Sequence, residues 1–143
     1  MSTEPAVATY VIAEPFERTV KTLREALARS GLNVAAELDV SVRIKHELNL
    51  GFTPCRILLV DSPYLLLEAV TVDCAAAVLF PLHIVVSGRG PHTHVHWMHP
   101  AAVDGLRLPP GGAVPLAKLL SLVSHTLERI AIRRDHLPSK VLI

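Results

Sequence analysis

The segment from His92 to Met98 alternates between histidines and residues that suit a protein interior. Successive side chains of an extended strand point to opposite faces. One face of this strand would carry His92, His94 and His96, and the other would carry Thr93, Val95 and Trp97. The pattern predicts a strand that packs one face on a core and turns a histidine face toward solvent, a second subunit or a ligand.

Hydrophobic spacing divides the rest of the chain into strands and helices. Alternating or short apolar runs predict strands over residues 7–13, 34–40, 56–60, 82–87 and 92–98. Apolar residues that recur every three or four positions predict helices over residues 15–30, 41–50, 64–72 and 114–130. Gly31 is an expected helix stop, and Ser62 followed by Pro63 is an expected helix start.

The order of these elements predicts an α+β fold. A β-α-β unit comes first, with strand 34–40 beside strand 7–13. Further strands follow, including a hairpin across residues 88–91, and a C-terminal helix closes the fold. We expect a largely antiparallel sheet that helices cover on one face. The chain fits a single domain over residues 1–143, with a core of about 7–134 and a tail at 135–143.

The charge balance and the apolar runs exclude several classes of protein. Fourteen Lys and Arg stand against 13 Asp and Glu, so no basic surface indicates binding to nucleic acid. The longest uncharged apolar run, residues 74–82, is far shorter than the roughly 20 residues that span a bilayer. The start of the chain lacks the pattern of a secretory signal. We therefore expect a soluble cytoplasmic protein, in which Cys55 and Cys74 are small buried apolar residues.

The histidines can be arranged as a metal site if the hairpin loop has four residues. A loop over residues 88–91 places His83 opposite His96 and brings both near His94. Imidazole suits zinc, copper or nickel, so His83, His94 and His96 are candidate ligands for a divalent metal or haem, with His92 and His99 as further candidates.

Two observations weigh against that metal site. A change of one residue in loop length would break the cluster, and no Asp or Glu lies between Cys74 and Pro100 to orient the imidazoles. An absence of any cofactor is therefore the default. In the alternative interpretation the histidine face meets solvent or a second copy of the chain. The apolar end Val141-Leu142-Ile143 and the exposed strand face together favour a homodimer. Clustered imidazoles at such an interface would repel one another in mild acid.

Catalytic motifs are missing from the chain. It has no Gly-x-Ser-x-Gly elbow, no phosphate-binding glycine loop and no His-Glu-x-x-His pair. A Ser/His/Asp set assembled from Ser62, His83 and Asp61 is supported by residue type alone. We interpret the chain as a non-catalytic module for small-ligand binding or assembly, with binding of a divalent metal or haem as the alternative.

Six segments of the chain form a pattern, at 16–20, 31–34, 37–40, 48–51, 56–58 and 79–81, which read FERTV, GLNV, ELDV, LNLG, RIL and LFP. With these segments in this order, the chain from about residue 7 to residue 130 resembles the domain of unknown function 302 family. It implies a fold of a β-α-β unit and further strands closed by a C-terminal helix. It implies no activity, because the family is defined without one.

This chain departs from the family at its cysteines. Members resemble one another in a Cys-Asn-Pro at the middle helix and a Leu-Leu-Pro-Cys-Asn at the next strand. Here the matching positions hold Ser62-Pro63 and Leu79-Phe80-Pro81-Leu82-His83, and His99-Pro100 stands where members often have Asp-Pro. Thiolate chemistry proposed for relatives therefore does not transfer to this chain.

Overall fold

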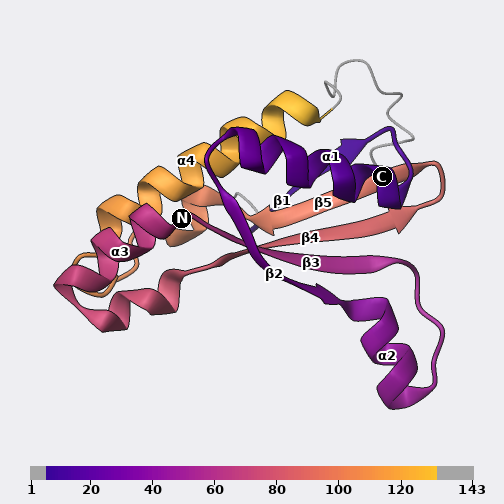
Figure 1. Ribbon diagram of the computed structural model, residues 1–143, viewed down its shortest axis with the longest axis horizontal. Helices are drawn as coiled ribbons and strands as arrows, with labels where there is room; N and C mark the ends of the chain where they lie inside the picture. Colours follow the sequence, from indigo (N-terminus) through magenta and orange to yellow (C-terminus); the bar gives the residue numbers. More distant parts are fainter. Residues whose placement is uncertain (1–5, 132–143) are drawn as a thin grey trace.

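The protein is built on one five-stranded sheet with helices packed against it (Figure 1), seen in a computed structural model that describes residues 6–131. The strands are β1 (Val7–Ile12), β2 (Asn33–Asp39), β3 (Cys55–Asp61), β4 (Leu82–Arg89) and β5 (His92–Met98). The helices are α1 (Phe16–Arg29), α2 (Val40–Leu48), α3 (Pro63–Val72) and α4 (Ala113–Ile130), with short 3-10 helices η1 (Cys74–Leu79) and η2 (Pro100–Val103). All neighbouring strands are antiparallel, which confirms the predicted α+β fold.

Helices α1 and α4 cover one face of the sheet. Their apolar residues recur at helical spacing, so each helix has one stripe that is removed from water. On α1 the stripe includes Val20, Leu23 and Leu27, and on α4 it includes Leu119 and Val123, all fully buried. The helices contact each other, and α1 also contacts β4 and β5. The core therefore lies between the middle strands and these two helices (Figure 1).

The two strands that flank α1 in sequence lie at opposite edges of the sheet. The strand order is β1-β5-β4-β3-β2, so the prediction that β2 lies beside β1 is wrong. The reason is the position of α1, which packs over β4 and β5 in the middle of the sheet. The chain leaves the β1 edge, crosses the sheet on the helix side and enters at the β2 edge.

The hairpin between β4 and β5 has a loop of two residues, Gly90 and Pro91, where the sequence predicts four. Gly90 has φ +66°, which suits the first position of a type II′ turn. The shorter loop shifts the partner of each β5 residue by two positions along β4 relative to the prediction. Val85, and not His83, therefore lies opposite His96.

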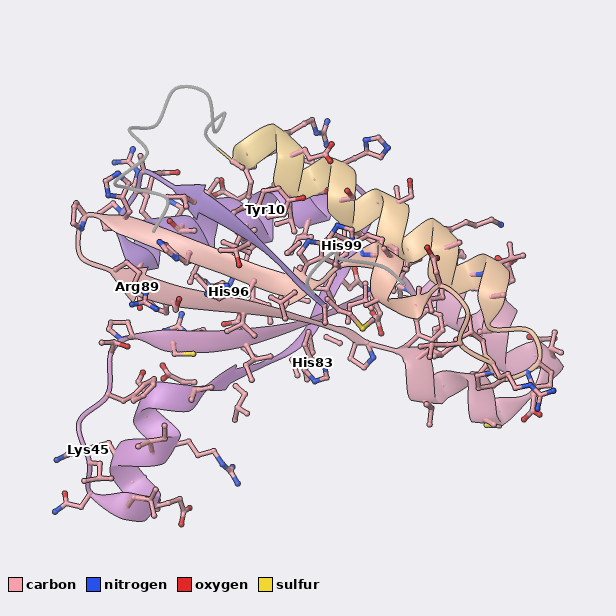
Figure 2. All side chains as sticks on the ribbon, turned by 180° about the vertical axis from the view of Figure 1, so that it is seen from behind. Tyr10, Lys45, His83, Arg89, His96 and His99 are labelled. Atoms are coloured by element: carbon pink, nitrogen blue, oxygen red, sulfur yellow. The ribbon has the colours of Figure 1, made fainter. Side chains whose placement is uncertain are left out.

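The face of the sheet away from α1 and α4 is covered by no helix among the described residues. We call it the open sheet face, and it comprises Ala36 and Leu38 of β2, Cys55, Ile57 and Leu59 of β3, His83, Val85, Ser87 and Arg89 of β4, His92, His94, His96 and Met98 of β5, and Val7, Thr9 and Val11 of β1. Figure 2 shows His83, Arg89 and His96 on this side. The predicted division of β5 is confirmed, because Val95 and Trp97 are buried on the opposite face.

Helix α2 projects beyond the β2 edge of the sheet, on the side away from α1 and α4 (Figure 1). Its start is set by Asp39, whose carboxylate accepts a hydrogen bond from the Val42 N–H at 2.9 Å. Its end is set by Asn49, which adopts the left-handed conformation two residues before the predicted stop at Gly51. No residue of α2 is buried.

Other parts of the prediction have mixed outcomes. Ser62 caps α3 as expected, since its Oγ accepts from the Leu65 N–H at 3.4 Å. The predicted burial of both cysteines is wrong, because Cys74 is exposed at the start of η1 and Cys55 is only half-buried. No helix within residues 6–131 has the length and apolar character needed to cross a membrane. The tail at 135–143, with its apolar end Val141-Leu142-Ile143, lies outside the described residues.

Candidate functional site

His96 is held at the centre of the open sheet face by hydroxyl groups on both neighbouring strands. Its Nδ1 lies 2.9 Å from Thr9 Oγ1 on β1, and its Nε2 lies 3.2 Å from Ser87 Oγ on β4. A neutral imidazole donates at one nitrogen and accepts at the other, and hydroxyl groups can satisfy either role. Both nitrogens of His96 are therefore engaged, and a metal ion could bind it only by displacing a hydroxyl.

The other candidate histidines have separate surroundings. The His94 ring lies beside that of His96, with centroids 6.0 Å apart. His92 pairs with Arg89 near the turn, and the exposed His83 pairs with Leu59 of β3. His99 accepts a hydrogen bond from the Ala101 N–H at its Nδ1 and so caps η2.

These positions do not add up to a metal centre within residues 6–131, where no three His, Cys, Asp or Glu side chains form a group that could hold a metal ion. The predicted contact of His83 with His96 fails because the hairpin loop is two residues shorter. Metal or haem binding through His83, His92, His94, His96 or His99 stays a prediction from the sequence.

Burial on the sheet favours the neutral forms of His94 and His96. Loss of hydration lowers the pKa of the His96 imidazole, and the neighbouring His94 and Arg89 lower it further. The pKa of His94 is lowered for the same main reason, with Arg89 and His92 contributing. Because the folded pKa lies below the ordinary value of 6.5, the unfolded chain takes up these protons first as the pH falls.

We therefore expect the free energy of unfolding to decrease as the pH falls below 6.5. The contribution of His96 to the free energy of unfolding is fully present above pH 6.5. It is lost as the pH falls from 6.5 through the lower pKa of the folded state. Replacing His96 with Gln should make this dependence shallower. The measurement is urea unfolding from neutral to mildly acidic pH. His125→Gln is the control, because His125 is exposed on α4. Equal slopes for wild type and His96→Gln would contradict the prediction.

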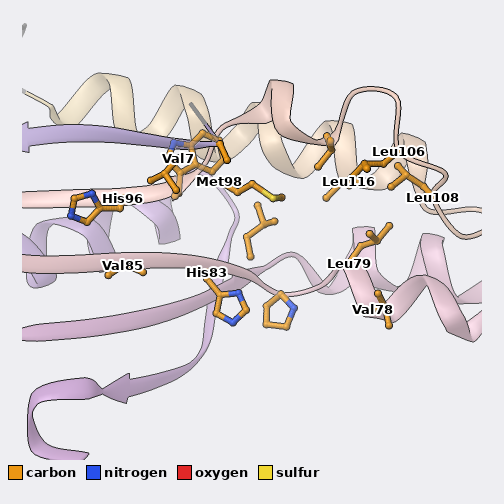
Figure 3. Close-up of a pocket in the computed structure, with 15 residues that line it drawn as sticks. Val7, Val78, Leu79, His83, Val85, His96, Met98, Leu106, Leu108 and Leu116 are labelled. Carbon is orange, nitrogen blue, oxygen red and sulfur yellow. The ribbon is translucent and has the colours of Figure 1, made fainter. Parts of the chain in front are cut away.

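An apolar hollow lies at the end of the sheet where β1 and β4 begin and β5 ends, next to η1, η2 and α4. We call it the strand-end pocket. Its volume is about 520 Å³, and its 15 lining residues include Val7, Leu79, His83, His96, Trp97 and Leu116. Figure 3 shows the strand residues on one side of the hollow and the residues of η1, α4 and the segment before α4 on the other. No Asp, Glu, Lys or Arg lines it.

Trp97 is the unusual member of this lining. Its side chain is 3% exposed, and the described part of the chain offers no hydrogen-bond partner to its buried indole Nε1–H. A buried donor left without an acceptor costs about 1–3 kcal/mol, and such groups are few in native proteins. The unpaired donor therefore belongs to a side chain that lines a pocket, and the volume of this pocket lies in the range of small-molecule sites.

A second hollow of about 570 Å³ lies on the other side of the segment between η2 and α4. It shares Val103, Leu108 and Leu116 with the strand-end pocket, and its α4 wall is more polar, with His125 and Glu128. Residues 103–108 thus form a partition between two cavities. The position of this segment decides the shape of both.

The Ser/His/Asp set is not assembled. The Ser62 hydroxyl is buried and caps α3, whereas His83 is exposed on the open sheet face. Within residues 6–131 no hydrogen bond joins Ser62, His83 and Asp61. The arrangement therefore lacks the nucleophile–base contact on which such catalysis depends.

Comparison with known proteins identifies the family. The model of the domain of unknown function DUF302 matches residues 8–125, whereas curated proteins give no match. A crystal structure of an uncharacterized conserved DUF302 protein from Bacillus stearothermophilus is similar, with a TM-score of 0.76 and 20% identity over 89% of this chain and 99% of that chain. At this identity the likeness shows the fold alone. The match over residues 8–125 confirms the resemblance seen in the sequence: this chain belongs to the DUF302 family, a domain of unknown function.

Proposed function

We propose that this chain is a non-catalytic binding module that holds one small apolar molecule in the strand-end pocket. The observation that carries the proposal is the unpaired indole N–H of Trp97, a residue of the pocket wall. A ligand with a hydrogen-bond acceptor that displaces the side chains covering this donor satisfies it and removes the cost of leaving it unpaired.

The lining of the strand-end pocket defines the class of ligand. Its polar side chains are Trp97, His83 and His96, and it contains no carboxylate and no Lys or Arg. A cation would find no counter-charge, and a fully charged anion would find no Lys or Arg. The pocket therefore suits a neutral or weakly acidic apolar molecule that carries a carbonyl or a similar acceptor.

A matched pair of small probes tests the proposal. Acetophenone carries a carbonyl, and ethylbenzene has nearly the same shape without one. The chain contains a single Trp, so its indole N–H gives one resonance in a ¹H–¹⁵N spectrum. We expect acetophenone to shift this resonance and to bind about tenfold more tightly than ethylbenzene, because one hydrogen bond to a buried donor contributes about 1–1.5 kcal/mol.

The control is Trp97→Phe, which removes the donor and retains an aromatic ring. This variant should bind both probes with the weaker affinity, measured from chemical shifts of other pocket residues. If acetophenone leaves the indole resonance of the wild type unchanged at saturating concentration, the proposed function is wrong.

A further inference from the structure

The open sheet face is a mixed surface, on which apolar residues of β3 and β4 lie beside the histidines of β5, and its charged side chains lie at the strand ends. Its central positions hold Ile57, Leu59, Val85 and His96. Among the described residues, the charged side chains on the alternation of this face are Arg89, at the turn end of β4, and Asp61, at the last position of β3. A second copy of the same face would therefore meet no repelling charge over the middle of the sheet. Such a face is typical of surfaces that bind another protein.

The size of the open sheet face indicates what else an interface needs. Five strands about 4.8 Å apart, each with about six residues at 3.3 Å, give a footprint of roughly 450–500 Å². A stable interface buries about 800 Å² on each partner. The sheet face alone is too small, so a stable dimer requires apolar surface next to it.

Helix α2 supplies that adjoining surface. We call α2 and the loop that follows it, residues 40–52, the α2 arm. It exposes Val42, Leu48, Leu50 and Phe52, with Val42 63% exposed. A helix of nine residues is marginal in water without tertiary packing, and no residue of α2 is buried in the single chain. A partner that covers the arm provides the missing packing.

The open sheet face and the strand-end pocket share residues. Val7, His83, Val85, His96 and Met98 belong to both. A molecule that packs on the open sheet face therefore also covers one side of the pocket. This step rests on the proposed function, since it concerns the same pocket.

We propose that two copies of this chain associate through the open sheet face and the α2 arm, and that each copy closes the strand-end pocket of the other. A self-complementary arrangement of this kind is the commonest symmetry of soluble oligomers. It buries the apolar residues of the open sheet face, extends the contact to α2 and shields a bound ligand from water.

Leu38→Glu tests the interface. Leu38 lies on the open sheet face next to the α2 arm and is 39% exposed, so the single chain can accommodate a charge there. In the dimer the same charge is buried without a partner, which we expect to weaken association about a hundredfold. Sedimentation equilibrium of the full chain should give twice the chain mass of 15.5 kDa for the wild type and the single mass for the variant.

Leu67→Glu is the matched control, because Leu67 is a 63% exposed leucine on α3, outside the open sheet face. It should remain dimeric. If circular dichroism shows that Leu38→Glu is unfolded, Val42→Glu on α2 takes its place. A wild type that is monomeric at all concentrations overturns the proposal, and so does an unchanged dimer in the folded Leu38→Glu or Val42→Glu variant.

Acetophenone binding separates this proposal from the proposed function. We expect the monomeric Leu38→Glu variant to bind acetophenone about tenfold more weakly than the wild type, although Leu38 does not line the pocket. Equal affinity would overturn pocket closure and leave ligand binding intact. A dimer without any shift of the Trp97 resonance would refute ligand binding and leave the interface intact.

Discussion

Replacing Ile84 with alanine is expected to lower the free energy of unfolding by about 2–5 kcal/mol. Ile84 is fully buried at the centre of the sheet, where its partners across the neighbouring strands are Leu58 and Trp97. Truncation removes buried methyl groups and leaves a cavity that the strands cannot close, since hydrogen bonds to β3 and β5 fix their spacing.

Urea unfolding followed by circular dichroism measures this loss. Leu67→Ala is the control, because Leu67 is exposed on α3, and it should change the free energy of unfolding by no more than about 0.5 kcal/mol. A similar loss in both variants would mean that the side of β4 facing α1 and α4 is not the core.

The helices of this fold could be predicted from the sequence because their signal is local. Val20, Leu23 and Leu27 recur at helical spacing, and all three are buried on α1. Ser62 and Gly31 mark boundaries through backbone hydrogen bonding and a positive φ, which depend only on near neighbours.

Strand order and register were harder to predict because they depend on distant parts of the chain. Alternation predicts which residues of a strand share a face of the sheet, and the structure confirms this prediction for β4 and β5. A shift of two residues preserves the faces and changes every partner. Because β4 extends through Gly88 and Arg89, the hairpin loop is two residues shorter than predicted. His96 therefore pairs with Val85 and not with His83.

The strand-end pocket could not be predicted for the same reason. Its walls come from three strand ends, η1, residues 103–108 and α4, which lie far apart in the sequence. The sequence feature that points to this pocket is Trp97, because the alternation of β5 places the single Trp of the chain on the buried face. Whether its N–H would find an acceptor there depended on the neighbours that the fold supplies.

Gly111→Ala is expected to lower the free energy of unfolding by about 2–5 kcal/mol through two separable effects. Gly111 has φ +80°, where an L side chain costs about 1–2 kcal/mol. An added Cβ would also overlap Val72 at the end of α3, and relief of such overpacking costs typically about 1–3 kcal/mol.

Gly105→Ala isolates the first effect, because Gly105 also has φ +80° but an added Cβ meets nothing within 4 Å. Val72→Gly isolates the second, because glycine removes the Val72 Cβ, the atom nearest to the added Cβ, which alanine would retain. Measured against Val72→Gly alone, the further change Gly111→Ala should cost no more than Gly105→Ala does in urea unfolding. A cost as large as that of Gly111→Ala in the wild type would show that the overlap with Val72 makes no contribution.

The same substitution connects stability with the binding site. Relief of the overlap moves the segment before α4 away from α3, and that segment carries Val103, Leu106 and Leu108 of the pocket wall. Gly111→Ala should therefore weaken acetophenone binding, measured from the Trp97 indole resonance, although Gly111 does not line the pocket. Val72→Gly should restore binding together with the part of the stability lost to the overlap, because one displacement of the segment causes both losses.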